Sequence, residues 1–393
     1  MGLVQLSDLT VKRGHKEVLK NFSLEIKSGE VVALSGENGC GKSTVIEAAA
    51  GLLHLDEGTV TISKQIIKDK EGRRGRTNFG LCLQDDCIMG DELVGQRLLD
   101  VAGKNFDVSK LLESWNLNHR INDRVAMLSG GQRRKLAVIS GILPALISDK
   151  PIAILLDEAD SGLDRVAITN LSEIIRNLAA SGHSILVSSH NENILNCADR
   201  IISFPFEAKT NNPKKGIPIH LKSKNNVKSN TGTTLDLRTM SSISNNCIVG
   251  LIVLGAMFAF LDPNSLKGRI EIAFLLAPSL AAGMCGDPIL RLLQENRAYA
   301  WWNAKSAIPP NAIMNVSLIC GGLTLLASAS TGDFDWRIIS VGAILGGFTA
   351  FVIAFIGHAT LNLSRPNAVM IKLLTPILIL PWALIVDALQ QYV

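Results

Sequence analysis

A nine-residue stretch, GENGCGKST at residues 36–44, constrains the fold of this chain more than any other feature of its sequence. The apolar run at residues 31–35 directly precedes it and predicts a buried strand, while residues 45–50 predict a helix. Glycines let the backbone bend so that its N–H groups approach a polyphosphate, at a helix N-terminus whose dipole favours anions. Strand, glycine-rich loop and helix in this order predict a phosphate-binding loop rather than an incidental glycine-rich turn.

Each residue of this loop has an expected role. Lys42 is expected to reach the β- and γ-phosphates of a nucleotide, and the Ser43 hydroxyl to ligate Mg²⁺, with Thr44 just behind it. The other predicted phosphate contacts are Gly36, Glu37, Asn38, Gly39, Cys40 and Gly41. Cys40 also adds a thiol that oxidants or alkylating reagents could modify.

Composition divides the chain into unlike parts. The 393 residues suffice for two or three domains, and hydrophobic residues reach 47% while charged residues are only 19%. Residues 1–206 have the composition of a globular domain, whereas residues 239–393 contain long uncharged runs typical of membrane spans. Residues 207–238 form a basic, polar linker, which either is simply solvated or is attracted to anionic lipid headgroups. Because no aromatic residues interleave with its lysines, nucleic acid is not an expected partner.

Two later segments carry further chemistry. Leu128–Gln132, LSGGQ, precedes a helix predicted over residues 133–143, and its serine and glycines form either a second anion site or a helix cap. The near-continuous apolar run 152–158 predicts a strand buried on both faces, as in a parallel sheet. It ends in Asp157, expected to hold Mg²⁺, and Glu158, expected to orient and deprotonate the attacking water.

Two single residues complete the predicted site. Gln84 ends the apolar segment 81–83, and His190 follows the strand predicted over residues 184–188. A lone histidine is more often structural than functional. His190 is nevertheless expected to touch the γ-phosphate, because the ends of neighbouring parallel strands meet at one edge of a sheet.

Taken together, these motifs resemble those of the ATP-binding cassette (ABC) ATPases. GENGCGKST matches the family's phosphate loop, Gln84 its Q-loop, LSGGQ its signature, ILLDE its acidic strand, ADSGLD its D-loop and His190 its switch histidine. The resemblance implies a P-loop NTPase with a parallel-sheet core, an antiparallel β subdomain and a helical subdomain. It implies ATP and Mg²⁺ as cofactors, with Glu158, His190 and Gln84 catalytic, Ser43, Gln84 and Asp157 at the metal, and Ser129, Gly130, Gly131 and Gln132 on the nucleotide.

The resemblance also implies a partner. Cassettes of this family dimerise head to tail, so the signature of one chain acts on the ATP of the other. This chain has one cassette, and a second copy is the simplest source of the other. One residue departs from the pattern: Arg13 stands where the family usually stacks an aromatic side chain on adenine, although an arginine plane can also stack on a base.

The C-terminal part predicts an all-α transmembrane domain of about five helices. Basic residues favour placing the loops at 287–305 and 365–372 in the cytoplasm with the cassette, within a multi-pass protein of the inner membrane. Residues 292–312 resemble the cytoplasmic coupling segment of type-2 ABC exporters. Their Trp301 and Trp302 are either a docking site for the cassette or part of an interfacial aromatic belt.

A finer resemblance concerns function. Residues 361–389 resemble the haem-exporter permease of cytochrome c maturation, and the short spacing from Gln84 to Leu128 resembles its ATPase subunit. This implies a fused ATPase and permease for haem export, with membrane lipid, haem and cytochrome c assembly proteins as partners. That permease family has six spans, whereas five are predicted here. Two alternatives stay open: an ATP-driven release machine that remodels a haem-carrier complex, and an exporter of another substrate.

Overall fold

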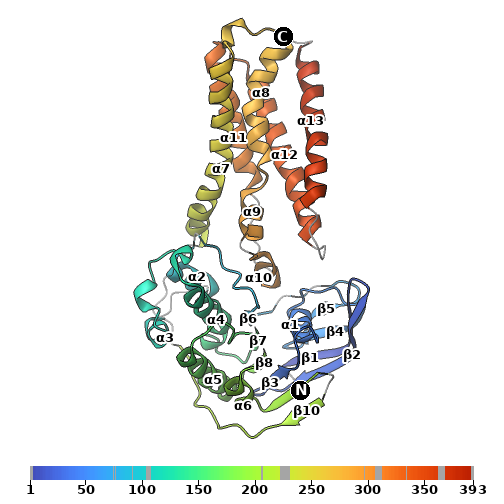
Figure 1. Ribbon diagram of the computed structural model, residues 1–393, viewed down its shortest axis with the longest axis vertical. Coiled ribbons are helices and arrows are strands. Elements are labelled where there is room, and N and C mark those ends of the chain that lie inside the picture. The colour runs from blue at the N-terminus through green and yellow to red at the C-terminus, as the bar shows by residue number, and fades with distance from the viewer. Residues whose placement is uncertain are drawn as a thin grey trace. The chain divides into compact units, whose positions relative to one another are not determined.

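The computed structural model describes residues 3–390, except 74, 76, 91, 103–107, 205–206, 222–230, 296, 306–311, 333 and 362–367. Two compact units make up the chain. The first, here the sheet unit, comprises Met1–Thr231 and Asn296–Ile308; the second, here the helical unit, comprises Gly232–Glu295 and Pro309–Val393. Figure 1 shows strands in the sheet unit and long helices in the helical unit.

A six-stranded sheet forms the centre of the sheet unit, in the order β10-β9-β3-β8-β7-β6. The strands are β3 Val31–Ser35, β6 Phe79–Cys82, β7 Ala153–Asp157, β8 Ser184–Ser188, β9 Arg200–Ser203 and β10 Glu207–Thr210. Five of these run parallel and β10 pairs antiparallel with β9. The predicted apolar strands are therefore confirmed, and β6, β7 and β8 are buried along their whole length.

An antiparallel sheet of four strands, in the order β2-β1-β4-β5, forms the second layer. Its strands are β1 Val4–Arg13, β2 Lys16–Ile26, β4 Glu57–Ile62 and β5 Gln65–Asp69. Alternating residues of β1 and β2 face a core shared with the parallel sheet and with helix α1, Lys42–Ala49. Alternating apolar and polar residues over 3–27 predict antiparallel strands around a turn, and the pairing of β1 with β2 confirms this.

Helices cover the other side of the parallel sheet. They are α2 Val94–Ala102, α3 Ser109–Ser114, α4 Gly130–Leu146, α5 Arg165–Ala180 and α6 Glu192–Asn196. Helix α4 extends beyond the predicted range at both ends. Helical spacing over residues 91–126 predicts Leu93, Leu98 and Leu112 as core residues. Leu98 and Leu112 are buried, but the prediction for Leu93 is wrong, because this residue is 40% exposed at an isolated bridge to Arg124.

The sheet unit continues past the expected boundary at residue 206. After β10, residues 211–221 run along the helical side: the Ile217 N–H donates to Asn177 Oδ1 at 2.8 Å, and the Leu221 N–H to the Leu146 carbonyl at 2.7 Å. The first part of the expected linker is thus bonded to the sheet unit. Residues 222–230 of that linker lie outside the described residues.

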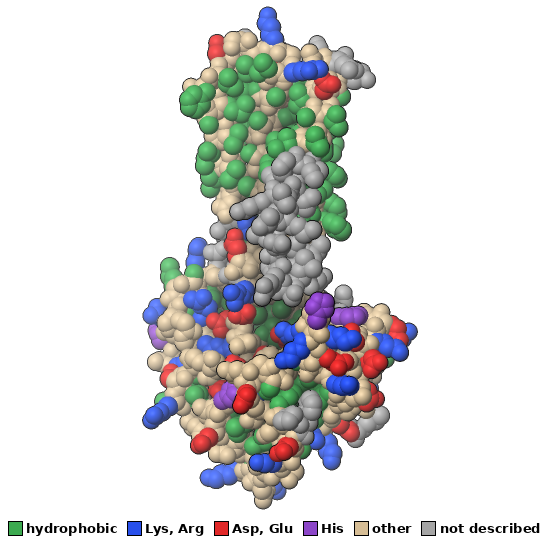
Figure 2. Space-filling model, turned by 45° about the vertical axis from the view of Figure 1, so that its right-hand side comes forward, with side chains coloured by type: hydrophobic (Ala, Val, Ile, Leu, Met, Phe, Trp, Pro, Cys, Tyr) green, Lys and Arg blue, Asp and Glu red, His purple; other side chains and the backbone are tan. Residues whose placement is uncertain are grey.

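The helical unit contains α7 Thr231–Phe260, α8 Arg269–Met284, α9 Pro288–Glu295, α11 Ile313–Thr331, α12 Trp336–Leu361 and α13 Ala368–Gln390. Among the described residues, four segments are long and apolar enough to cross a membrane: Ile243–Phe260, Arg269–Glu295, Ile313–Thr331 and Trp336–Gly357; Leu378–Gln390 is a shorter apolar helix. Figure 2 shows hydrophobic side chains over the surface of these helices and charged side chains of both signs on the sheet unit. The expected all-α domain is confirmed.

Polar side chains are few inside the helical unit, and those described are bonded. Asp287, which is 3% exposed, lies at the break between α8 and α9 and accepts at one carboxylate oxygen from the N–H groups of Ile289 and Ala312. Arg291 donates to the Cys285 carbonyl at 3.1 Å and to Asn246 Oδ1 at 3.3 Å. These contacts tie together the ends of α8, α9 and α11 and join them to Asn246 of α7.

Candidate functional site

The loop between β3 and α1 has the strained backbone that its glycines permit. Gly36 and Gly41 have φ of 138° and 118°, and a Cβ on Gly36 would meet Cys40 Sγ at 3.1 Å. The Lys42 ammonium folds back over the loop and donates to the carbonyls of Gly36 at 2.8 Å and Glu37 at 2.9 Å. The loop therefore holds a buried cation at the N-terminus of α1, which is the setting a polyphosphate requires.

Oxygen groups gather beside the loop at the end of β7. The Ser43 hydroxyl donates to Asp157 Oδ1 at 3.1 Å, and the Ser188 hydroxyl donates to the same oxygen at 2.6 Å. Asp157 is 1% exposed, and this burial raises the pKa of its carboxyl, although both hydroxyl hydrogen bonds oppose the rise. A hydroxyl and a carboxylate at this spacing are hard oxygen donors that suit Mg²⁺.

Glu158 lies next to this group in a left-handed backbone conformation, with φ of 45°. Its backbone N–H donates to Ser188 Oγ at 2.8 Å, which fixes the residue at the end of β8. The Gln84 amide donates to Glu158 Oε2 at 3.4 Å. The structure thus brings together Ser43, Asp157, Glu158 and Gln84, as the sequence predicted.

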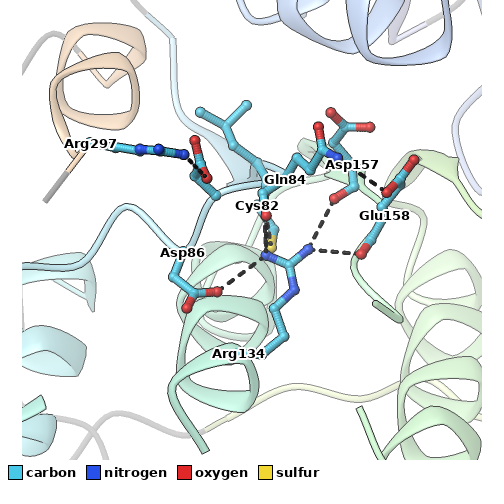
Figure 3. A network of polar contacts seen from close by, with 9 residues as sticks. Cys82, Gln84, Asp86, Arg134, Asp157, Glu158 and Arg297 are labelled. Carbon is cyan, nitrogen blue, oxygen red and sulfur yellow. Dashed lines mark hydrogen bonds and ion pairs between the residues drawn. The ribbon is translucent and has the colours of Figure 1, made fainter. Parts of the chain in front are cut away.

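Arg134 also belongs to this site, although no motif in the sequence predicts it. Figure 3 shows its guanidinium on α4 between the Gln84 segment and the end of β7. It donates to the Leu83 carbonyl at 2.9 Å and to the Glu158 carbonyl at 2.8 Å, and lies 3.4 Å from Asp86 Oδ1. Arg134 is 5% exposed, and its hydrogen bonds hold together the two chain segments that carry Gln84 and Glu158. Arg134 is the middle one of three consecutive cations, Arg133–Lys135, so the sequence alone does not distinguish it from its neighbours.

A pocket of about 440 Å³ surrounds the loop. Its lining combines loop residues with Gln84, Glu158 and two residues of the antiparallel sheet, Arg13 and Val18. Of the described residues, neither His190 nor any residue of the LSGGQ segment lines this pocket. The pocket therefore unites most of the predicted loop residues with Gln84 and Glu158, but it leaves out His190 and the signature.

The LSGGQ segment forms the start of α4. Ser129 is the N-cap: its hydroxyl accepts from the Gln132 N–H at 3.3 Å, while the Gln132 side chain accepts from the Ser129 N–H at 3.0 Å. Within a single chain, the LSGGQ segment is therefore a helix cap, which was one of the two interpretations. Ser129 and Gly130 remain exposed, as does His190 after β8, so these groups are open to a ligand or a second chain.

Residues 297–305, which follow α9 in the chain, belong to the sheet unit and pack against its strand β6. Helix α10, Tyr299–Ala304, carries Trp301, which is 6% exposed and donates its indole N–H to the Leu81 carbonyl of β6 at 3.0 Å. Arg297 pairs with Asp85 at 3.2 Å, next to Gln84 (Figure 3). Trp301 is thus a contact of the sheet unit and does not belong to an aromatic belt.

The same segment covers a buried arginine on α2. The Arg97 guanidinium lies 3.9 Å from the ring centre of Trp301 and 3.9 Å from Glu92, and both charged side chains are almost fully buried. Such a stack on an indole is favourable when it excludes water. Residues 297–305 therefore contact both the strand that leads to Gln84 and the helix that follows it.

Comparisons with known proteins agree with this geometry. A family model described as ABC transporter matches residues 19–161. The glutamate/aspartate import ATP-binding protein of Escherichia coli is 32% identical over 199 residues, which are 48% of this chain and 80% of that protein. An ABC transporter ATP-binding/permease protein of Mycobacterium tuberculosis is 30% identical over 208 residues, and a Nod factor export ATP-binding protein of Burkholderia lata is 33% identical over 186.

The extent of these matches differs. The aligned regions cover 50% and 45% of this chain, but only 23% of the Mycobacterium protein and 59% of the Burkholderia protein. A solved dimer of a bacterial ABC transporter cassette also matches, with a TM-score of 0.46 and 22% identity, over 54% of this chain and all of that one. Because the aligned 199 residues are 32% identical to an ATP-binding protein and cover 80% of its length, the chain belongs to the ABC transporter family, and its sheet unit is an ATP-binding cassette.

Proposed function

We propose that the chain is an ATP-hydrolysing half-transporter whose permease follows the cassette in the same polypeptide. The observation that carries this proposal is the docking of residues 297–305 onto β6. These residues lie in the chain between two segments that could cross a membrane, and they contact the strand that leads to Gln84. A movement at Gln84 would therefore be transmitted to the helices on either side.

The hydrolytic roles follow from the geometry of the site. Lys42 and the loop N–H groups would hold the phosphates, with Glu37, Asn38 and Thr44 around them. Ser43, Asp157 and Gln84 would hold Mg²⁺, which neutralises charge on the β- and γ-phosphates. Glu158, held by Ser188 and Gln84, would orient and deprotonate water. His190, exposed at the end of the neighbouring strand, would contact the γ-phosphate.

The exposed signature supports action in a dimer. Ser129, Gly130, Gly131 and Gln132 lie outside the pocket of their own chain, and an exposed helix N-terminus can bind an anion brought by another molecule. A second copy of this chain would therefore complete each ATP site. The helices would lie in the inner membrane with the cassette cytoplasmic, because the loop with Arg291, Arg297 and Lys305 is basic.

The domain limits belong to the same proposal. Residues 1–206 would form the ATP-binding core and residues 239–393 the permease. Residues 207–238 would join them, with the part to residue 221 held against the cassette.

Haem export for cytochrome c biogenesis is the specialisation we propose. Its support is the resemblance of residues 361–389 to the haem-exporter permease, of which residues 362–367 lie outside the described part of the chain. The glutamate/aspartate and Nod factor relatives act, by their names, on amino acids and Nod factors, so haem rests on that resemblance and on the short spacing from Gln84 to Leu128.

Inside-out vesicles containing the full chain test the proposal. With Mg·ATP and haem, we expect haem to accumulate in the vesicles, and we expect none with Glu158→Gln. ATP hydrolysis without haem accumulation would contradict haem transport. Nucleotide-dependent dissociation of a membrane haem carrier, with nothing crossing the bilayer, would instead favour the release machine. ATP hydrolysis stimulated by another lipid or drug, and not by haem, would favour an exporter of that substrate.

A further inference from the structure

We infer that Arg134 is a positioning residue for hydrolysis: its guanidinium holds Glu158 where that carboxylate meets the attacking water, so a chain without this guanidinium binds ATP but turns it over slowly. This rests on the proposed function in one respect, because Glu158 must be the general base. Arg134 is not among the described residues that line the pocket around the phosphate loop. It therefore acts through the backbone of the residues that it bonds.

Glu158 has to be held because its backbone is strained. Its φ of 45° lies in the left-handed region, where a residue with a Cβ stays only if surrounding contacts fix it. Its backbone N–H donates to Ser188, to Oγ at 2.8 Å and to the carbonyl at 3.1 Å. Its carbonyl accepts from Arg134 Nη2 at 2.8 Å and from the Ser161 N–H at 2.9 Å. Arg134 thus supplies the hydrogen bond that ties this carbonyl to another element of the fold.

The same guanidinium bonds the segment that carries Gln84. Its Nη1 donates to the carbonyls of Leu83 at 2.9 Å and Gln84 at 3.1 Å, while Nη2 also donates to the Asp157 carbonyl at 3.1 Å (Figure 3). Leu83 and Gln84 follow the last residue of β6 that pairs with β7, so the sheet ladder no longer fixes them. One planar group therefore sets the distance between two segments whose side chains meet, since Gln84 Nε2 lies 3.4 Å from Glu158 Oε2.

Helix α4 anchors this guanidinium in the core. Every residue of α4 from Leu136 to Leu146 is buried, so the helix that carries Arg134 is fixed along most of its length. The guanidinium is itself buried and lies 3.4 Å from Asp86 Oδ1, which balances its charge. Removing it would leave buried carbonyls without this donor, and an unsatisfied buried acceptor is costly. The two segments would then move apart to reach other donors or water.

Such a movement affects turnover more than binding. A general base acts only within hydrogen-bond reach of the proton that it takes, and a displacement of about 1 Å can cost about a hundredfold in rate. The phosphates would be held instead by Lys42 and the N–H groups of the loop. Among the described residues, Arg134 donates to the segments around Gln84 and Glu158 and not to that loop. Loss of the guanidinium should therefore lower kcat and leave the affinity for Mg·ATP nearly unchanged.

The test measures kcat and the dissociation constant of Mg·ATP on the full chain in detergent. Arg134→Met keeps a long side chain but has no donor, so its kcat should fall by about 10- to 100-fold. Its dissociation constant for Mg·ATP should change by less than about threefold. Arg134→Lys keeps the charge, but an ammonium is a point donor that does not span both segments, so its kcat should fall as well.

Added guanidinium ion provides a second measurement. Arg134→Ala leaves room for this ion, which should raise the kcat of that variant by at least about fivefold, the value of one hydrogen bond. Ammonium ion should have no such effect. Arg134→Met should not respond to guanidinium, because its side chain fills the space.

Arg133→Met is the matched control, because Arg133 is the neighbouring arginine on α4 and its Nε has no hydrogen-bond partner among the described residues. It should leave kcat and the affinity for Mg·ATP unchanged, and an equal loss of kcat in this variant would overturn the inference.

A normal kcat in Arg134→Met would overturn the inference, and so would a normal kcat in Arg134→Lys, since charge alone would then suffice. A dissociation constant that rises as much as kcat falls would overturn it too, because Arg134 would then act on binding or on the fold. The same holds if guanidinium raises the rates of Arg134→Ala and Arg134→Met equally, or raises neither. If the original chain hydrolyses no ATP, or Glu158→Gln hydrolyses it normally, the proposed function itself fails, which is a different result from any of these.

Discussion

Replacing Trp301 by alanine should release residues 297–305 from the cassette. The indole is 6% exposed, fills a place in the core with β6, donates to the Leu81 carbonyl at 3.0 Å and lies 3.9 Å from the Arg97 guanidinium. Truncating a buried tryptophan to alanine costs about 3–5 kcal/mol, which includes the lost hydrogen bond and stack. At about 1.4 kcal/mol per factor of ten, the docking equilibrium should fall by at least about a hundredfold.

Hydrogen–deuterium exchange of the full chain in detergent measures the docking equilibrium of residues 297–305 directly. In Trp301→Ala, the backbone amides of α10 should exchange at least about a hundredfold faster. Trp301→Phe keeps a ring against Arg97 and loses the N–H donor, so its effect should be near 1 kcal/mol, about a fivefold change. Trp336→Ala is the matched control, because that tryptophan is 71% exposed. Equal protection of α10 in the original chain and in Trp301→Ala would refute the docking on which our account of coupling depends.

Three further results are expected. Neither a Lys42→Ala homodimer nor a Ser129→Ala homodimer should hydrolyse ATP well, but mixed dimers should regain activity through one intact composite site; verified mixed dimers without any gain would contradict shared sites. Cys40, half-buried with its sulfur 4.0 Å from the Lys42 ammonium, should react with a maleimide in the nucleotide-free protein and be protected by Mg·ATP; labelling that ATP does not change would contradict this placement. Burial, with Arg97 nearby, lowers the pKa of Lys305 to about 7 from 10.5, so the undocked segment binds one more proton between these values. Docking of α10 should therefore strengthen as pH rises from about 7, and Lys305→Met should remove that dependence; exchange of α10 that is equally pH-dependent in both proteins would exclude it.

The phosphate loop and the buried strands were predictable because their signals are local. Glycines at 36, 39 and 41, and apolar runs that end in Asp157 or Ser188, specify strand, turn and ligand edge within a few residues. The same logic predicted that Glu158 lies at the ligand edge, since parallel strands bring their ends together, whereas the role expected of Gln84 came from the resemblance to the ABC ATPases.

Arg134 and the path of residues 211–221 were not predictable in this way. Arg134 matters because it bonds carbonyl groups, which leave no trace in side-chain patterns. Residues 211–221 are polar and basic, typical of a solvated linker, yet backbone groups such as the Leu221 N–H find partners on distant helices. Leu93 shows the converse error, since helical spacing predicted burial where the chain forms a bridge to Arg124. For Trp301, the sequence allowed two interpretations, and only contacts across more than two hundred residues separate them.

The most direct test of the central claim is the steady-state ATPase rate of Glu158→Gln, measured with Mg·ATP binding on the same preparation of the full chain. Removing a general base should slow turnover by at least about a hundredfold. Binding should remain, because Lys42, Ser43 and Asp157 are unchanged, and the variant should accumulate as an ATP-bound dimer. A variant that binds ATP and hydrolyses it at a near-normal rate would contradict the assignment of Glu158, and with it the catalytic site described for this cassette.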